Sequence, residues 1–387
     1  MEIFWKYLFI ICLAILVYNY LGYSILASLI ALFRKNKAFN TDWSKNIHVT
    51  VIIPAYNEAG LLQEKLTNTL NALTPFDQFQ IVLITDGSND GSENITIESN
   101  KILHLHSGER KGKSAAINRA VQHSAGDIIV ITDANAFIND KGFVHLISRF
   151  EDIKTGAVSG EKKVLSTNGS TGGEGIYWKY ESFVKLQSAK MNSLTGAAGE
   201  LIAFRKELFK PLPEDAILDD LELSFQIIRK NKKIDYEPLA YVTEPPSKSI
   251  KEEFSRKVRI AAGVFQTLVR NPFVFNPFKH SVFIFQFFSH RLLRWVVGPP
   301  CILLLFISNI MLMYIYRTEI NIFTVIGLLQ VLFYMFVLIG FLLRNSKNIP
   351  SVLFVPFYFI MTNTAISIGF FRYLGKKETV LWKKASR

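Results

Sequence analysis

Four long runs without a charged side chain constrain this chain more than any other feature of its sequence. They span residues 7–33, 296–316, 320–343 and 349–371. At about 1.5 Å of helix rise per residue, each run is long enough to cross the roughly 30 Å hydrocarbon core of a bilayer. We therefore predict an N-terminal transmembrane helix within residues 1–34 and two or three C-terminal transmembrane helices within residues 296–371.

The composition excludes several other classes of protein. Hydrophobic residues make up 49% of the chain, too many for a disordered protein. The two cysteines, Cys12 and Cys301, lie in apolar runs and are interpreted as small apolar fillers, not as a disulfide or a metal pair. A cleaved signal peptide is the alternative for the first run, but that run is longer than the apolar region of a signal peptide, and no A-x-A type site follows it.

Basic residues predict which side of the membrane each segment faces. Arg34, Lys35 and Lys37 follow the first run, whereas Lys6 alone precedes it. The positive-inside rule therefore places the middle of the chain in the cytoplasm, and we expect a multi-pass protein of the inner (plasma) membrane. The same rule agrees with basic residues beside the second and third runs, which are Arg291, Arg294, Arg344 and Lys347.

The last run leaves two interpretations open. It contains Pro350, Pro356 and a polar stretch at 362–364, and a basic tail follows at residues 372–387. Four complete crossings would place that tail outside, against the positive-inside rule. Either the run does not cross completely or the tail breaks the rule, and we favour the first. The basic residues of the tail are Lys376, Lys377, Lys383, Lys384 and Arg387.

The formal net charge is +12, from 44 Lys and Arg against 32 Asp and Glu. No basic helix with base-reading spacing and no RRM-type motif is present, so we do not expect nucleic acid as a partner. Attraction to an anionic inner leaflet explains the charge better. Residues 272–295 combine many Phe with His290, Arg291 and Arg294, which predicts an amphipathic segment at the membrane surface.

The middle of the chain, residues 45–270, predicts an α/β domain. Short β-branched runs alternate with helical patterns, which is typical of βαβ units on a parallel sheet. In such sheets, ligands bind at the carboxyl ends of the strands. The predicted strands are residues 48–54, 80–85, 102–105 and 127–132, and the clearest helical patterns are 61–70 and 113–123.

Polar motifs follow two of these strands directly. Asp86 opens a turn with two glycines, where its carboxylate could accept a hydrogen bond from a base or a ribose; an ordinary Asx-rich turn is the alternative. Asp133 and Asn135 are two residues apart, so their oxygens can point the same way and hold a hard cation beside phosphates. A plain helix N-cap at Asn135 is the alternative.

Charged residues also stand at three predicted helix positions. Lys113 opens a helix whose N-terminus favours a diphosphate, although a solvated basic loop is the alternative. Asp219 and Asp220 precede an amphipathic helix, where they act as caps or where one serves as a general base. Arg256 and Arg259 share a helix face that could bind a leaving diphosphate or form a basic stripe facing the membrane.

The order of these motifs resembles that of the membrane glycosyltransferases of family 2, the GT-A group that includes cellulose, hyaluronan and poly-N-acetylglucosamine synthases. The resemblance runs over about residues 47–270 and, in layout, the flanking apolar runs. It implies an α/β fold in which a cytoplasmic GT-A domain, Rossmann-like with a mostly parallel sheet, is flanked by transmembrane helices. The motifs that carry it are Pro54-Ala-Tyr56-Asn-Glu58, Asp86-Gly-Ser, Gly112-Lys113, Asp133-Ala-Asn135, Gly196-Ala-Ala-Gly199, Asp219-Asp220 and Arg256-x-x-Arg259.

The resemblance also implies a role for each matching residue. Asp133 and Asn135 match the position that holds Mg²⁺ or Mn²⁺ beside the diphosphate, and Asp220 matches the base that activates the acceptor hydroxyl. Gly199, Asp219 and Arg256 are implied to border the acceptor. The residues implied to bind the UDP-sugar donor are Pro54, Tyr56, Glu58, Asp86, Lys113, Asp133 and Arg259.

Two departures from the family pattern qualify these expectations. Asn135 replaces the second Asp of the Asp-x-Asp motif, so one metal ligand is neutral. Arg256 and Ile260 replace the Gln and Trp of the Gln-x-x-Arg-Trp motif. In polymerising members that Trp helps to hold the acceptor sugar, so its absence puts processive synthesis in doubt.

The resemblance implies an inverting transferase that moves a sugar from a UDP-sugar to a hydroxyl of a membrane lipid or lipid-linked glycan, in cell-surface glycan or exopolysaccharide assembly. A processive synthase of the cellulose or poly-N-acetylglucosamine type is the alternative within this class. A catalytically silent scaffold that binds a nucleotide sugar is the alternative outside it. The expected partners are the donor, the acceptor and the bilayer, and a homo-oligomer or a synthase complex stays open.

Overall fold

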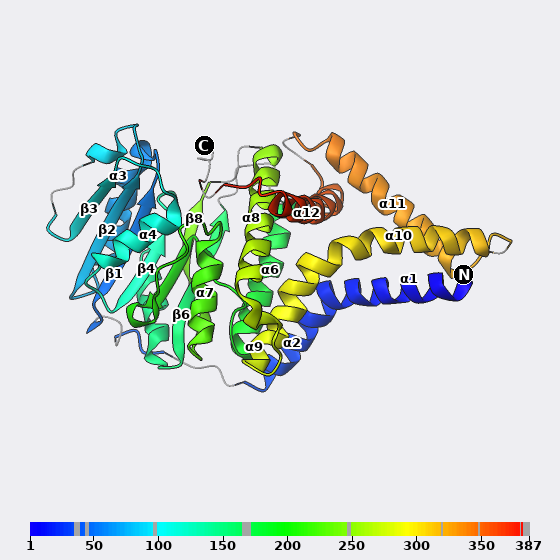
Figure 1. The fold of residues 1–387 in the computed structure, drawn as a ribbon, viewed down its shortest axis with the longest axis horizontal. Coiled ribbons are helices and arrows are strands. Elements are labelled where there is room, and N and C mark those ends of the chain that lie inside the picture. Colours follow the sequence, from blue (N-terminus) through cyan, green and yellow to red (C-terminus); the bar gives the residue numbers. More distant parts are fainter. Residues whose placement is uncertain are drawn as a thin grey trace.

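The structure is a computed structural model that describes residues 1–34, 39–42, 46–95, 99–164, 172–245, 249–318, 320–346, 349–379 and 381, with the backbone alone for 172–178. An α/β part and a group of long apolar helices follow one another along the longest axis of the molecule (Figure 1). Some of the basic residues used to predict orientation lie outside the described residues: Lys35, Lys37, Lys347, Lys383, Lys384 and Arg387.

One eight-stranded sheet forms the α/β part, in the order β3-β2-β1-β4-β7-β6-β8-β5. Strands β3, β2, β1 and β4 are parallel, as their continuous apolar runs predict. Strand β7 is antiparallel to β4 and β6, and β5 is antiparallel to β8, so the second half of the sheet is mixed. The strands are β1 (Val49–Ala55), β2 (Phe79–Asp86), β3 (Ile102–Ser107), β4 (Ile128–Thr132), β5 (Phe137–Ile138), β6 (Thr155–Val164), β7 (Leu201–Arg205) and β8 (Lys233–Glu244).

Helices cover both faces of this sheet and close an apolar core on each. Leu62 of α3 and Phe143 of α5 are fully buried in the core on one face. Ile117 of α4 and Phe225 of α7 are fully buried in the core on the other face. The helices of the α/β part are α3 (Ala59–Leu73), α4 (Lys113–Gln122), α5 (Gly142–Ser148), α6 (Gly172–Met191), α7 (Asp219–Arg229) and α8 (Ile250–Arg270).

Among the described residues, four helices are long and apolar enough to cross a membrane. The first joins α1 (Glu2–Val17), the π-helical η1 (Tyr18–Gly22) and α2 (Tyr23–Leu32); the second joins α9 (Ser281–Phe287), the π-helical η7 (Phe288–Val297) and α10 (Gly298–Ile315). The others are α11 (Ile322–Leu342) and α12 (Ser351–Leu374). The sequence predicts a boundary between residues 295 and 296, but one continuous helical run, Ser281–Ile315, passes through it.

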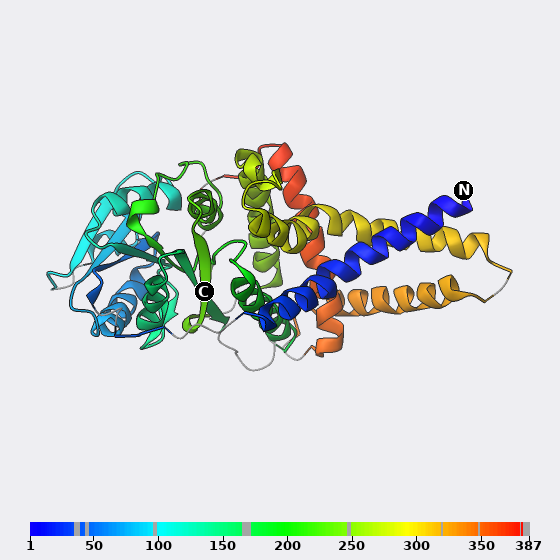
Figure 2. The ribbon, with the colours of Figure 1, turned by 90° about the horizontal axis from the view of Figure 1, so that it is seen from below.

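Helix α12 differs from the other apolar helices in direction. Helices α1, α10 and α11 extend away from the α/β part (Figure 1), whereas α12 runs across them beside that part (Figure 2). It packs closely on α8: a Cβ added to Gly369 would lie 2.5 Å from Cβ of Ala261 and 2.8 Å from the carbonyl oxygen of Val258. The rings of Phe265 and Phe370 lie 5.0 Å apart along the same contact.

Polar contacts fix the π-helical segments of the first two spans. The hydroxyl of Tyr18 in η1 donates to Ser289 Oγ in η7 at 2.8 Å. The hydroxyl of Tyr23 and that of Ser188 in α6 lie 2.9 Å apart, in hydrogen-bond contact. Segments of π-helix are frequent at functional sites, and η7 carries two residues of the cavity described below.

Candidate active site

Asp220 lies in the first turn of α7, beside a loop that precedes β7. Its Oδ1 accepts a hydrogen bond from the backbone N–H of Leu221 at 2.8 Å. Burial raises the pKa of Asp220 to about 7; the charges of Asp219 and Glu200 add to this rise, and Lys113 opposes it. A carboxylate with such a pKa can both accept and hold a proton near neutral pH, as a general base requires.

Lys113 contacts three of the predicted site residues. Its Nζ lies 2.8 Å from Asp133 Oδ1, 3.5 Å from Asp219 Oδ2 and 3.4 Å from the carbonyl oxygen of Gly199. Against the effect of burial, Asp133 and Asp219 hold the pKa of Lys113 well above its ordinary value. The ammonium group is therefore a fixed positive charge between the end of β4 and the start of α7.

A buried lysine that sequence reasoning missed supports the turn after β4. Lys65 of α3 is fully buried and donates to Thr132 Oγ1 at 3.0 Å and to the carbonyl oxygen of Ala136. Burial lowers its pKa to about 7, although Asp133 and Glu244 raise it. The two hydrogen bonds hold the side chain of Thr132 and the backbone of Ala136, on either side of Asp133 and Asn135. Lys65 belongs to a helical pattern in which a lysine normally faces solvent, so the sequence carries no signal for this role.

The residues after β4 provide a limited set of metal ligands. Asp133 offers a carboxylate next to Lys113, and the nearly buried Asn135 offers an amide. Among the described residues, no group of three or more His, Cys, Asp or Glu side chains could hold a metal ion. Mg²⁺ is commonly held by one or two protein oxygens together with substrate phosphates. Asp133 and Asn135 fit that second mode, and they do not form a complete metal site by themselves.

Asp86 is completely buried, and its hydrogen bonds hold the loop before α4. Its Oδ2 accepts the backbone N–H groups of Lys111 and Gly112 at 3.0 and 2.6 Å, and its Oδ1 accepts from Arg119 at 2.8 Å. Gly87 follows with φ +69°, and a Cβ there would lie 2.5 Å from Cβ of Arg110. Asp86 thus positions the segment that delivers Lys113.

The loop after β1 lies against this same region. Pro54 is buried in β1, and the backbone N–H of Glu58 donates to Ser92 Oγ at 2.9 Å. The guanidinium of Arg110 lies 3.5 Å from the centroid of the Tyr56 ring. Tyr56 and Glu58 are partly exposed next to the loop that Asp86 holds, in the position from which they could contact a nucleotide.

Arg259 and Arg256 of α8 take different positions. Burial lowers the pKa of Arg259, and the charges of Asp219, Glu378 and Asp220 oppose this, so Arg259 is within electrostatic reach of both carboxylates of the α7 start. Arg256 lies 3.0 Å from Glu253 of its own helix and lines the cavity described next. Arg259, the predicted diphosphate ligand, and Arg256, the predicted acceptor-side residue, are thus three residues apart on α8.

A group of buried charges between β6 and β8 was also missed by sequence reasoning. Lys162 lies 2.7 Å from Glu200 and 2.8 Å from Glu244, and all three side chains are largely buried. Although burial raises it, Lys162 holds the pKa of Glu200 well below its ordinary value. Glu200 stays ionised and follows Gly199, so it contributes to the raised pKa of Asp220.

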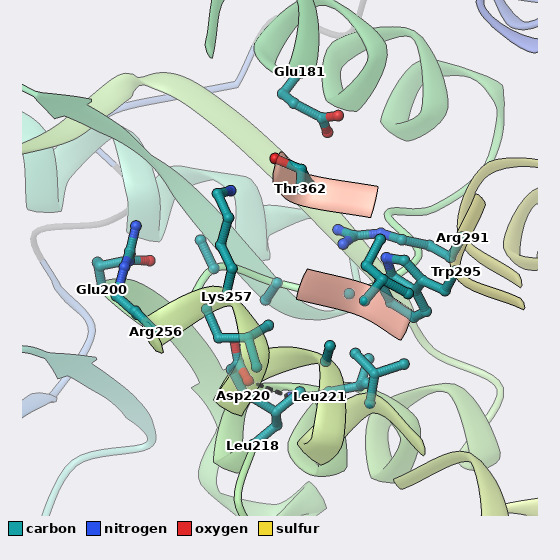
Figure 3. A pocket seen from close by; sticks show the side chains of 18 of the residues that line it. Glu181, Glu200, Leu218, Asp220, Leu221, Arg256, Lys257, Arg291, Trp295 and Thr362 are labelled. Carbon is teal, nitrogen blue, oxygen red and sulfur yellow. Dashed lines mark hydrogen bonds between the residues drawn. The ribbon is translucent and has the colours of Figure 1, made fainter. Parts of the chain in front are cut away.

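A cavity of about 270 Å³ lies on the other side of Asp220 (Figure 3). Asp220 and Leu218 stand on one side of it, and Thr362, Arg291 and Trp295 lie across from them. Ile260 also lines it, at the position where the family pattern has Trp. The other polar or charged lining residues are Lys162, Glu181, Lys185, Glu200, Arg256 and Lys257.

Gly199 permits the close approach of its loop to Asp220. A Cβ at this position would lie 3.2 Å from Asp220 Oδ2, tighter than ordinary van der Waals contact. We expect Gly199→Ala to displace the carboxylate and lower kcat about tenfold to a hundredfold, because small misplacements of a reacting group are costly. Steady-state kinetics tests this, with Gly60→Ala as control, since a Cβ at Gly60 meets nothing within 4 Å. Equal rates in both variants would contradict the expectation.

Comparison with known proteins identifies the domain that carries Asp86, Lys113 and Asp133. Residues 50–212 match the family described as Glycosyl transferase family 2. The poly-beta-1,6-N-acetyl-D-glucosamine synthase of Staphylococcus aureus (strain MSSA476) is 23% identical over 259 residues, which span 64% of this chain and 62% of that protein. The synthase of the same description from Staphylococcus epidermidis is 23% identical over 386 residues, 92% of each chain.

A solved structure confirms the fold. The mannosyltransferase PcManGT from Pyrobaculum calidifontis, in complex with GDP-Man and Mn²⁺, is similar with a TM-score of 0.70 and 20% identity, over 96% of this chain and 100% of that one. The predicted GT-A architecture with flanking apolar helices is therefore correct. Residues 50–212 of this chain therefore form a glycosyl transferase family 2 domain.

Proposed function

We propose that the protein is an inverting glycosyltransferase that moves a sugar from a UDP-sugar to a hydroxyl group of a membrane-associated acceptor. One observation carries the proposal: Asp220, with its pKa raised to about 7, stands between a donor side with Lys113 and Arg259 and a cavity that leads to the apolar helices. A base in that position faces both substrates.

The reaction is a single displacement at the anomeric carbon of the donor. Asp220 takes the proton of the acceptor hydroxyl, and the hydroxyl oxygen forms a bond to that carbon. The bond from the carbon to the diphosphate oxygen breaks, and UDP leaves with the electron pair. Lys113 and Arg259 stabilise the charge that develops on UDP. Because the acceptor attacks opposite to the leaving group, the configuration at the anomeric carbon inverts.

We further propose that Asp133 and Asn135 hold a divalent cation, Mg²⁺ or Mn²⁺, together with the donor diphosphate. When bound, the cation offsets negative charge on the diphosphate. The structural neighbour was solved with Mn²⁺, which supports this assignment. Lys113 lies at the same carboxylate, so the positive charge there is shared between the lysine and the cation.

The names of the relatives bear on the product. Both synthases named above make poly-beta-1,6-N-acetyl-D-glucosamine, which supports N-acetylglucosamine as the sugar and an exopolysaccharide as the destination. The small cavity and the aliphatic Ile260 favour a short acceptor and the transfer of a single sugar to each acceptor.

We propose that the α/β part lies on the cytoplasmic side of the inner membrane, with α12 at the membrane surface and not across the bilayer. The direction of α12 in Figure 2 and its contact with α8 support this placement. In Lys376→Cys, a membrane-impermeant thiol reagent is expected to label the new cysteine only after permeabilisation of the cells. The native Cys12 and Cys301 are buried, so wild type is the control. Labelling of intact cells would contradict the placement.

The proposed function is tested on the purified full-length protein in lipid nanodiscs with Mn²⁺ or Mg²⁺. Labelled UDP-N-acetylglucosamine, UDP-glucose and GDP-mannose are offered with a membrane lipid extract as acceptor, and the products are sized. We expect one sugar on a lipid-extractable product from a UDP-sugar. A long ladder of polymer products would establish the processive synthase. UDP binding without transfer from any donor would establish the catalytically silent scaffold.

A further inference from the structure

The end of the cavity opposite Asp220 is built from elements that border the apolar helices. Arg291 and Trp295 come from η7, which runs directly into α10, and Thr362 and Ile366 come from α12 (Figure 3). This end is separate from the donor side, where Lys113 and Asp133 lie. A group bound here would therefore be part of the acceptor, in a place that the proposed donor does not reach.

Positive charge is in excess on the wall of the cavity. Five basic side chains line it against three carboxylates, and these are Lys162, Lys185, Arg256, Lys257 and Arg291 against Glu181, Glu200 and Asp220. Glu200 is bound by Lys162 at 2.7 Å, and Glu181 is bound by Arg294, which does not line the cavity. Lys257 is paired with Glu253 at 3.6 Å, and Arg291 is the basic side chain that stands beside Trp295 at this end of the cavity.

Arg291 and Trp295 form a pair with a fixed geometry. Arg291 Nε donates to Thr195 Oγ1 at 3.2 Å, and its guanidinium lies 5.2 Å from the centroid of the Trp295 ring. The rings of Trp295 and Phe287 form a T-shaped pair, with 6.1 Å between centroids and 78° between planes. Guanidinium groups bind phosphate oxygens in pairs of hydrogen bonds, and an indole ring offers a flat apolar surface to a sugar ring.

The remaining wall is apolar and the space is small. Ile260, Val264, Phe265 and Ile366 line it on the side of α8 and α12. A volume of about 270 Å³ is at the low end of ligand pockets, enough for one sugar with a phosphate and too small for a long glycan. A phosphate at this depth, next to apolar helices, is most simply attached to a lipid chain.

We propose that this end of the cavity binds the phosphate of a lipid-linked sugar, with Arg291 on the phosphate and Trp295 against the sugar ring. The sugar then extends toward Asp220, which receives the proton of its hydroxyl group. The inference rests on the proposed function and specifies the acceptor as a phosphate-linked glycolipid.

The test is an equilibrium binding measurement on the full-length protein in neutral lipid nanodiscs, with no donor present. The labelled probes are polyprenyl diphosphate-linked N-acetylglucosamine, an uncharged alkyl glycoside of the same sugar, and the water-soluble sugar phosphate. Wild type is expected to bind the first probe most tightly. Arg291→Gln is expected to weaken that binding about tenfold or more, since a charge-assisted hydrogen bond is lost. Binding of the alkyl glycoside should barely change.

Two further variants separate the two contacts, and a third serves as control. Arg291→Lys should retain part of the preference for phosphate. Trp295→Leu should weaken the binding of the lipid-linked probe and of the alkyl glycoside to the same extent. Arg344→Gln removes an exposed arginine that donates to the carbonyl oxygen of Phe341 and does not line the cavity, so it should bind like wild type. UDP affinity, measured on each variant, reports that the α/β domain is folded.

Equal binding of the charged and uncharged probes by wild type, or unchanged binding in Arg291→Gln, would overturn the proposal. Binding of the soluble sugar phosphate as tightly as the lipid-linked probe would overturn the lipid part of it. The binding measurement requires no turnover. If the glycolipid binds but no donor gives transfer, the proposed function fails while the proposal for this binding site stands.

Discussion

Replacing Asp220 with asparagine is expected to abolish sugar transfer while UDP affinity is retained. The amide cannot accept the proton of the acceptor hydroxyl, and loss of a general base costs about 10²- to 10⁴-fold in rate. Asp220 lines the cavity, whereas Lys113 and Asp133, which pair with each other, do not line it, so donor binding should persist. Transfer is measured with a labelled donor, and UDP affinity by calorimetry on the same preparation.

The same variant carries an expectation for stability. Burial raises the pKa of Asp220 above that of the unfolded chain, so ionisation of this group lowers stability as the pH rises from about 4 to about 7. Asparagine removes that cost, and the variant should unfold at a temperature no lower than wild type at pH 8. The exposed Asp215→Asn is a control that should keep full activity. Near-normal transfer by Asp220→Asn would show that Asp220 is not the general base.

Replacing Arg259 with alanine is the second substitution with a large expected effect. Arg259 lies within electrostatic reach of Asp219 and Asp220, and it is proposed to meet the diphosphate of UDP as it leaves. Loss of one group that stabilises developing charge lowers rates about 10²- to 10³-fold. Unlike Asp220→Asn, this variant should also bind UDP more weakly, because the product diphosphate loses the same contact. Both quantities are measured on the full-length protein in nanodiscs.

Arg270→Ala is the matched control for this experiment. Arg270 ends the same helix and forms an ion pair with Asp215, away from the carboxylates of the site. It should change neither UDP affinity nor turnover. Unaltered turnover in Arg259→Ala would mean that Arg259 does not contact the leaving group, and Lys113 would then be the next candidate for that role.

The parallel half of the sheet could be predicted because its strands are buried on both faces. Residues 49–55 and 128–132 are continuous apolar or β-branched runs, and the structure places strands there within one residue of the prediction. Strands β6 and β8 could not be predicted in this way. Strand β6 contains Gly156, Gly160 and Lys162, and β8 contains Pro238, so neither shows the apolar pattern of a buried strand.

Part of the candidate site could likewise be predicted from the sequence, and part could not. Lys113, Asp133 and Asp219 are brought together as the motif order implies, because strand ends and helix starts of an α/β sheet meet at one edge. Lys65 and Glu244 carry no local motif, and their proximity depends on the packing of α3 and β8. The position of Arg291 and Trp295 depends on where η7 returns to the domain, which a sequence pattern does not specify.

If Asp220 is the base, the pH dependence of transfer reports the ionisation of its carboxyl group. We expect kcat/KM to fall below a pH of about 7, where Asp220 becomes protonated and can no longer accept a proton. Because the charge of Asp219 raises the pKa of Asp220, Asp219→Asn should move this fall to lower pH. A profile that is flat between pH 5 and 8, or one that stays in place in Asp219→Asn, would mean that Asp220 is not the base.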